Sequence, residues 1–196
     1  MRIFAAIAAS FFMFPVALAA QVWVMGEEAY LAGDYATALE ELLPYAREGN
    51  IETQLLIASI YEDSEGGFLD YAEAVRWYRL AAEQGSAYAQ TALGFNYSNG
   101  VGVSQDYAEA LRWYRAAALQ GHARGQLLLG VMYLDGQGVL QDNVLAHMWV
   151  NIAASHGAAP IALFRDALSE RMTPTDISEA QRRARICMES DYTDCD

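Results

Sequence analysis

The sequence predicts an all-α protein, a solenoid whose helical units repeat every 36 residues. Aspartates recur at this interval, and glycines recur at the same interval, each 15 residues after an aspartate. The aspartates are Asp34, Asp70, Asp106 and Asp142, and the glycines are Gly49, Gly85, Gly121 and Gly157. A fixed period of about 20 to 50 residues is typical of solenoids, in which each unit buries its apolar face only against its neighbours.

Residues 1–20 have the features of a secretory signal peptide. Arg2 forms a short basic region, an apolar run follows, and Ala17-Leu18-Ala19 supplies the small residues of a cleavage site. The run is shorter than the roughly 20 residues that a membrane-spanning helix requires. A retained N-terminal anchor is the alternative interpretation. We expect a periplasmic or secreted protein that does not insert into the membrane once the signal has been removed.

Residues 21–196 are expected to form one solenoid domain. Its units span about residues 22–49, 50–85, 86–121 and 122–157, followed by a C-terminal cap at 158–196. The last three units share an upstream helix with a small residue at position 58, 94 or 130. A glycine in mid-helix costs about 1 kcal/mol relative to alanine, so Gly94 and Gly130 indicate a closely packed neighbouring helix.

The helix between each aspartate and its glycine is amphipathic. Between residues 106 and 121 the apolar side chains have the spacing i, i+3, i+4, i+7 and i+8, which forms one stripe on a helix. They are Ala110, Trp113, Tyr114, Ala117 and Ala118. Asp106 can cap the first turn, and Gly121 can close the helix. Trp77, Trp113 and Trp149 share one phase of this stripe, so we assign them to the core and not to a ligand-stacking ladder.

The C-terminal cap is predicted to contain a helix at 161–171 and a second helix that starts at Thr173-Pro174. Cys187 and Cys195 are the only cysteines, and an oxidising compartment favours a disulfide between them, with a redox-active pair as the alternative. Arg182, Arg183 and Arg185 form a basic cluster that either pairs with carboxylates or serves as a docking site.

The repeat also resembles a known family. Residues 89–121 follow the pattern Ala-Gln-x-x-Leu-Gly-x-x-Tyr-x-x-Gly-x-Gly-Val-x-x-Asp-x-x-x-Ala-x-x-Trp-Tyr-x-x-Ala-Ala-x-x-Gly. This pattern is similar to the Sel-one-like repeat, a subclass of the tetratricopeptide-like helical repeats, and the resemblance extends over residues 51–157. It implies a right-handed superhelix of antiparallel helix pairs whose concave surface binds other proteins or peptides. Residues 64–68 depart from the pattern, because they replace the Gly-x-Gly-Val loop.

The sequence predicts no catalytic, cofactor or metal site. His122, His147 and His156 do not have the spacing of a metal-binding pair, and the Gly-x-Gly loops do not follow strands. Ser155-His156 lacks the elbow motif of a nucleophile. Asn96-Tyr97-Ser98 fits a glycosylation sequon but lies within a helix that we expect to be packed. The formal net charge of −13 argues against nucleic acid as a partner, since phosphate binding requires clustered basic charge.

The resemblance implies that the first helix of each unit lines the concave side, which is then the candidate partner-binding groove. The positions that the repeat pattern leaves variable there are Ser59, Ile60, Phe95, Asn96, Val131 and Met132. Several of these are apolar, and exposed apolar groups in a groove mark recognition sites. The alternative is that these side chains pack between units.

These observations favour a non-enzymatic adaptor that binds a protein or peptide through this groove. The resemblance adds the expectation that such an adaptor regulates an envelope signalling or assembly system, or contacts a host. Two alternatives remain open. One is a hydrolase acting on cell-wall-like or β-lactam substrates, an activity that the resemblance suggests only through cysteine-rich relatives. The other is a purely structural spacer.

Overall fold

The computed structural model describes residues 24–64 and 66–195. The predicted signal peptide lies outside these residues. The described part of the chain consists of helices joined by turns and short loops, and it contains no strand. The chain divides into two compact units between Leu69 and Asp70. A single domain over residues 21–196 stays a prediction.

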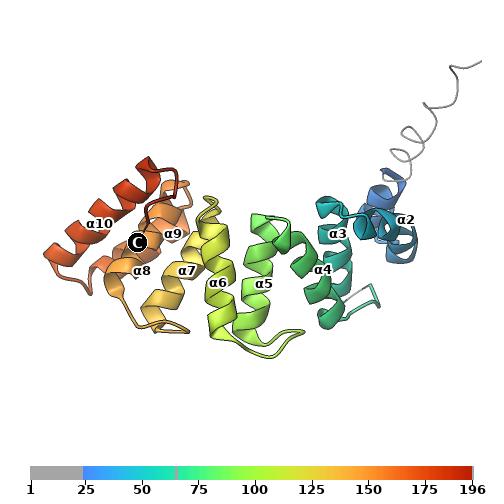
Figure 1. Cartoon of the computed structure of the whole chain (residues 1–196), viewed down its shortest axis with the longest axis horizontal. Coiled ribbons are helices and arrows are strands. Elements are labelled where there is room, and N and C mark those ends of the chain that lie inside the picture. Colours follow the sequence, from blue (N-terminus) through green and yellow to red (C-terminus); the bar gives the residue numbers. More distant parts are fainter. Residues whose placement is uncertain (1–23, 65, 196) are drawn as a thin grey trace, which may run out of the picture. The chain divides into compact units, whose positions relative to one another are not determined.

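The N-terminal unit contains a helical segment at 24–31 followed by α2 (Tyr35–Arg47) and α3 (Ile51–Glu62). Helices α2 and α3 pack against each other (Figure 1). The hydroxyl of Tyr35 donates to Oδ2 of Asp63 at 2.5 Å, which ties the start of α2 to the residue after α3.

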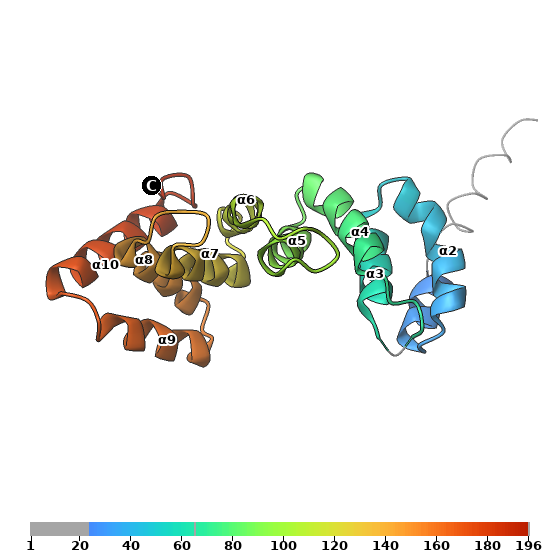
Figure 2. The same ribbon diagram turned by 90° about the horizontal axis from the view of Figure 1, so that it is seen from below.

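The C-terminal unit contains six further helices of similar length and a longer last one. They are α4 (Tyr71–Glu83), α5 (Ala87–Asn99), α6 (Tyr107–Ala118), α7 (Ala123–Asp135), α8 (Asn143–Ser155), α9 (Ala159–Ser169) and α10 (Pro174–Glu189). From α4 to α9 each helix packs on the next one in the chain, which is the arrangement of a solenoid (Figures 1 and 2). The predicted all-α solenoid with 36-residue repeats is therefore confirmed.

Side-chain caps recur with the repeat. Oδ1 of Asp106 accepts hydrogen bonds from the backbone N–H groups of Ala108 and Glu109 at 2.9 and 3.1 Å, and Asp70 and Asp142 make the equivalent bonds. Each cap satisfies two N–H groups that have no partner within the helix. The aspartates that reveal the period in the sequence thus fix where the second helix of each pair begins.

The core follows the predicted apolar stripe. Trp113 and Trp149 are buried, as are the alanine pairs that follow them, and Trp77 is 9% exposed. The prediction that the tryptophans are core side chains is confirmed. Because the indole rings lie between helices, they are not available as a stacking surface for a ligand.

The glycines within the first helices allow close helix packing. A Cβ added at Gly94 would lie 2.7 Å from Cδ1 of Tyr114, and one added at Gly130 would lie 2.9 Å from Cγ2 of Val150. Both distances are too short for a real contact. The small residue at each of these positions therefore sets how closely α5 approaches α6 and how closely α7 approaches α8.

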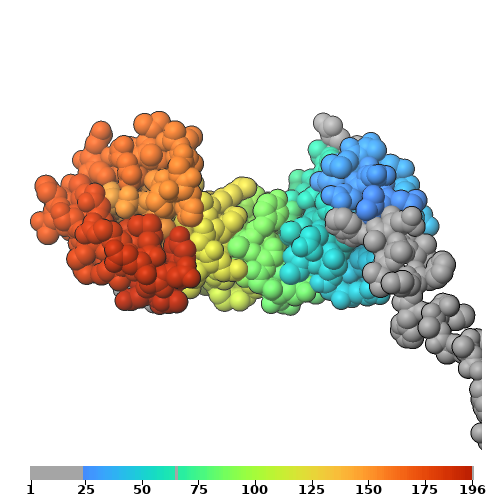
Figure 3. Space-filling view, turned by 90° about the horizontal axis from the view of Figure 1, so that it is seen from above, coloured from blue at the N-terminus to red at the C-terminus, as the bar shows by residue number. Residues whose placement is uncertain are grey.

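The C-terminal cap covers the last repeat. Helix α9 begins at Ala159, two residues before the predicted start, because Pro160 is compatible with a first helical turn. Helices α9 and α10 both pack on α8, and Figure 3 shows them in orange and red at one end of this unit. Cys187 and Cys195 form a disulfide, with their Cα atoms 4.5 Å apart, so the tail is tied to α10.

Candidate protein-binding surface

The structure places the six predicted groove residues in different environments. Ile60, Asn96 and Met132 are buried, with exposures of 2% or less, so their assignment to an open groove is wrong. Each follows a more exposed neighbour, and successive helical residues are rotated by about 100°. That rotation turns these three side chains toward packed helices. Phe95 is 43% exposed, and Ser59 and Val131 are half-buried.

Two first helices of the C-terminal unit present an accessible face that is largely apolar. We call it the α5–α7 face and define it by residues spaced i, i+4 and i+7 on each helix. They are Tyr88, Ala92 and Phe95 on α5, and Arg124, Leu128 and Val131 on α7, all exposed or half-buried. Helices α5 and α7 contact each other directly, so the two rows are adjacent. Of the six residues, only Arg124 is charged.

The side chains beneath this face hold the two helices together. Nδ1 of His122 accepts the backbone N–H of Gly125 at 3.3 Å and lies 2.9 Å from the hydroxyl oxygen of Thr91 on α5. Burial lowers the pKa of His122, and the nearby Arg124 and His156 lower it further. The neutral ring therefore serves as a hydrogen-bonded link from α5 to α7.

Three buried glutamines at 36-residue intervals each tie their own helix to the preceding one. Nε2 of Gln54, Gln90 and Gln126 donates to the carbonyl oxygen of Ala46, Ala82 and Ala118, respectively, at 2.9 to 3.2 Å. The carbonyl belongs in each case to the end of the preceding helix. Oε1 of Gln126 is 3.1 Å from Nε2 of His156, so this ring nitrogen must be the donor. This role was not predicted from the sequence, although the recurrence of glutamine every 36 residues is a signal of it.

His147 links α8 to α9. Its Nε2 lies 2.8 Å from Oγ of Ser169, and the Ser169 hydroxyl donates to the carbonyl of Arg165, so Nε2 carries the proton. Nδ1 is buried and has no hydrogen-bond partner within the described chain. Burial lowers the pKa of His147, the nearby Arg165 lowers it further, and Asp166 acts in the opposite direction.

This lowered pKa predicts a pH-dependent stability. The unfolded chain takes up a proton at His147 below about pH 6.5, whereas the folded chain does so only at lower pH. Unfolding should therefore become easier as the pH falls from 7 toward the folded pKa. We expect the free energy of unfolding of His147→Gln, measured by urea unfolding followed by circular dichroism, to depend less steeply on pH than that of the parent. Identical slopes for the parent and the variant between pH 7 and pH 5 would contradict this explanation.

The other residues considered for catalysis, glycosylation or metal binding do not form a site. Oγ of Ser155 donates to the carbonyl of Ile152 at 2.6 Å, while His156 bonds to Gln126. Asn96 is 1% exposed, so the sequon asparagine is inaccessible in the folded chain. Among the residues that the structure describes, no group of three or more histidine, cysteine and acidic side chains has a metal-binding arrangement.

Comparisons with known proteins agree with this geometry. The model of the Sel1 repeat matches residues 51–86, 87–122 and 123–157. Among solved structures, the chain is similar to a protective antigen of uropathogenic Escherichia coli strains that displays an SLR fold. The TM-score is 0.76 at 25% identity, over 89% of this chain and 39% of the antigen. The chain thus spans about two fifths of the antigen's length.

A second solved structure is similar over a shorter range. It is a Sel1 repeat protein from Oxalobacter formigenes, with a TM-score of 0.59 and 35% identity over 66% of this chain and 97% of that protein. No curated protein matches the chain. Within residues 24–64 and 66–195, none of the helices has both the length and the apolar character needed to cross a bilayer.

Proposed function

The chain belongs to the Sel1 repeat family, whose fold typically mediates protein–protein interaction, and on that premise we propose that it is a non-enzymatic adaptor. It binds a protein or peptide through the α5–α7 face. The observation that carries this proposal is the exposure of Phe95, at 43%, beside half-buried Leu128 and Val131 on an adjacent helix. Accessible apolar side chains grouped in this way favour recognition of a partner.

The character of the α5–α7 face indicates how such a partner binds. Phe95 offers a large apolar surface at the C-terminal end of its row, and aromatic side chains often dominate binding energy at interfaces. Arg124 adds a cation at one end of the face, where it can pair with an acidic group of the partner. The ring of Tyr88 lies near the buried ring of Tyr78, with centroids 6.5 Å apart and the ring planes tilted by 53°.

We further propose that the adaptor works in the periplasm or outside the cell, within an envelope signalling or assembly system. Residues 1–20 have the features of a cleaved signal peptide. The Cys187–Cys195 disulfide supports an oxidising compartment, because disulfides persist there and are rare in the cytosol. Fractionation of cells that make the full chain, compared with a chain lacking residues 2–20, tests this placement. Recovery of the full-length chain only in the cytosol would refute it.

The partner-binding proposal predicts an effect of charge on the α5–α7 face. We expect Phe95→Asp and Val131→Asp each to weaken partner binding by at least about tenfold, since each buries a carboxylate in an apolar contact. The measurement is capture of partners from envelope extract, followed by affinity determination with the purified partner. Leu140→Asp is the matched control, because Leu140 is 88% exposed in the loop before α8. Equal capture of partners by the parent and by all three variants would contradict the assignment of the α5–α7 face.

A further inference from the structure

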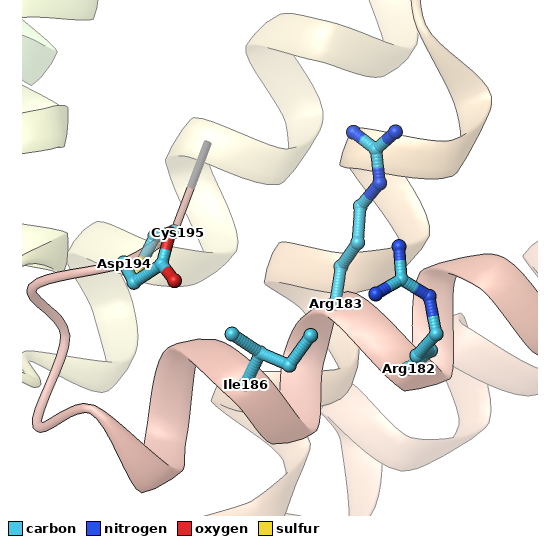
Figure 4. A pocket seen from close by; sticks show the side chains of 5 residues that line it. All are labelled: Arg182, Arg183, Ile186, Asp194 and Cys195. Carbon is cyan, nitrogen blue, oxygen red and sulfur yellow. The ribbon is translucent and has the colours of Figure 1, made fainter.

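A small pocket lies between α10 and the C-terminal tail. Its volume is about 240 Å³, and it is lined by Arg182, Arg183, Ile186, Asp194 and Cys195. Figure 4 shows the two arginines on α10, Asp194 and Cys195 on the tail opposite them, and Ile186 between the two sides. The pocket is smaller than the roughly 300 to 1,000 Å³ typical of sites for drug-sized ligands. It therefore suits a ligand smaller than a drug-sized molecule.

The arginine side of the pocket is fixed by one carboxylate. Nε and Nη2 of Arg182 donate to Glu179 at 2.8 and 2.7 Å, and Nε of Arg183 donates to it at 2.7 Å. These bonds lower the pKa of Glu179 to about 2, so the carboxylate is ionised at neutral pH. Within the described residues, both Nη groups of Arg183 have no hydrogen-bond partner. They are available to bind an anion.

The tail side of the pocket carries the opposite charge. The backbone N–H of Asp194 donates to Oγ of Ser190 at 3.0 Å, and the next residue is held by the disulfide to Cys187. No side chain in the described part of the molecule pairs with the Asp194 carboxylate. The pocket thus has a free anion on the tail, free cationic N–H donors on α10, and the apolar Ile186 between them.

We propose that this pocket binds a free α-amino acid with an aliphatic side chain. The ligand's carboxylate pairs with the guanidinium of Arg183, its ammonium group pairs with Asp194, and its side chain lies on Ile186. The pocket is lined by both guanidinium groups and a carboxylate, and groups of opposite charge suit a zwitterion better than a dianion such as phosphate. The site is separate from the α5–α7 face, so this inference does not depend on the proposed function.

Titration of the ¹⁵N-labelled, oxidised protein with L-leucine tests the proposal. We expect the amide signals of Ile186, Asp194 and Cys195 to shift and saturate, with a dissociation constant on the order of 1 mM, since exposed ion pairs contribute little individually. N-acetyl-leucine lacks the ammonium group and leucinamide lacks the carboxylate. Both should bind at least tenfold more weakly than L-leucine.

Two variants assign the binding to the proposed contacts. Arg183→Gln and Asp194→Asn should each abolish saturable shifts, while Arg185→Gln should bind like the parent, because Arg185 is exposed on α10 and does not line the pocket. Circular dichroism confirms that each variant is folded. Absence of shifts in the parent would overturn the proposal. Equal binding of N-acetyl-leucine would also overturn it, because the pocket would then bind the carboxyl end of a peptide.

Discussion

Substitution of Gly130 by leucine is expected to lower the free energy of unfolding by about 3 kcal/mol or more. The Cβ of any larger residue at this position would lie 2.9 Å from Cγ2 of Val150 and 3.0 Å from the carbonyl oxygen of Ala146. The carbonyl belongs to the backbone of α8, so relief of the overlap requires the two helices to separate. Gly130→Ala should have a smaller effect, because the gain of about 1 kcal/mol in helix propensity offsets part of the cost.

Urea unfolding followed by circular dichroism measures this effect. Ala108→Leu is the matched control, because it introduces the same leucine side chain at an exposed position in the first turn of α6. It should change the free energy of unfolding by no more than about 0.5 kcal/mol. If Gly130→Leu were as stable as this control, the approach of α7 to α8 would not be as close as the structure shows.

Replacement of Gln126 by leucine is the second substitution with a large expected effect. Gln126 is fully buried, its Nε2 satisfies the carbonyl of Ala118, and its Oε1 accepts from His156. Leucine would leave the Ala118 carbonyl without this donor. The carbonyl would keep its bond from the backbone N–H of Gly121, so the cost is the loss of two hydrogen bonds, from Gln126 to Ala118 and from His156 to Gln126, at about 0.5–1.5 kcal/mol each.

Gln141→Leu is a control for burial alone. Nε2 of Gln141 also donates to a backbone carbonyl, that of Leu134 at 2.7 Å, but Gln141 is exposed. Water can replace this bond, so the control should lose no more than about 0.5 kcal/mol in thermal or urea unfolding. Equal losses for the two variants would mean that the buried glutamines do not hold the first helices against the preceding ones.

The 36-residue period made most of the fold predictable. Asp106 and its equivalents marked the starts of the second helices, and the Trp113 stripe marked their buried side. The six variable groove positions were less predictable. Helices α5 and α7 carry small or apolar residues on most of their faces, because they are buried on more than one side. The pattern therefore did not show that Asn96 and Met132 point inward while Phe95 points outward.

Other features depend on contacts that the sequence does not display. The amide of Gln126 finds its partner eight residues earlier, at the end of a different helix. The pocket beside α10 forms only because the tail turns back onto α10. Asp191 and Tyr192 adopt φ values of 52° and 63° in that turn. Non-glycine residues rarely take this conformation, so the path of the tail was not predictable from their types.

Site-specific photo-crosslinking tests the central claim most directly, namely that the α5–α7 face binds a protein partner. A p-benzoylphenylalanine residue would be placed at position 95, 131 or 140 in cells that produce the chain. We expect an adduct of one partner at positions 95 and 131 and none at position 140, because Leu140 is exposed but does not belong to the face. Adducts at position 140 with none at positions 95 and 131 would contradict it.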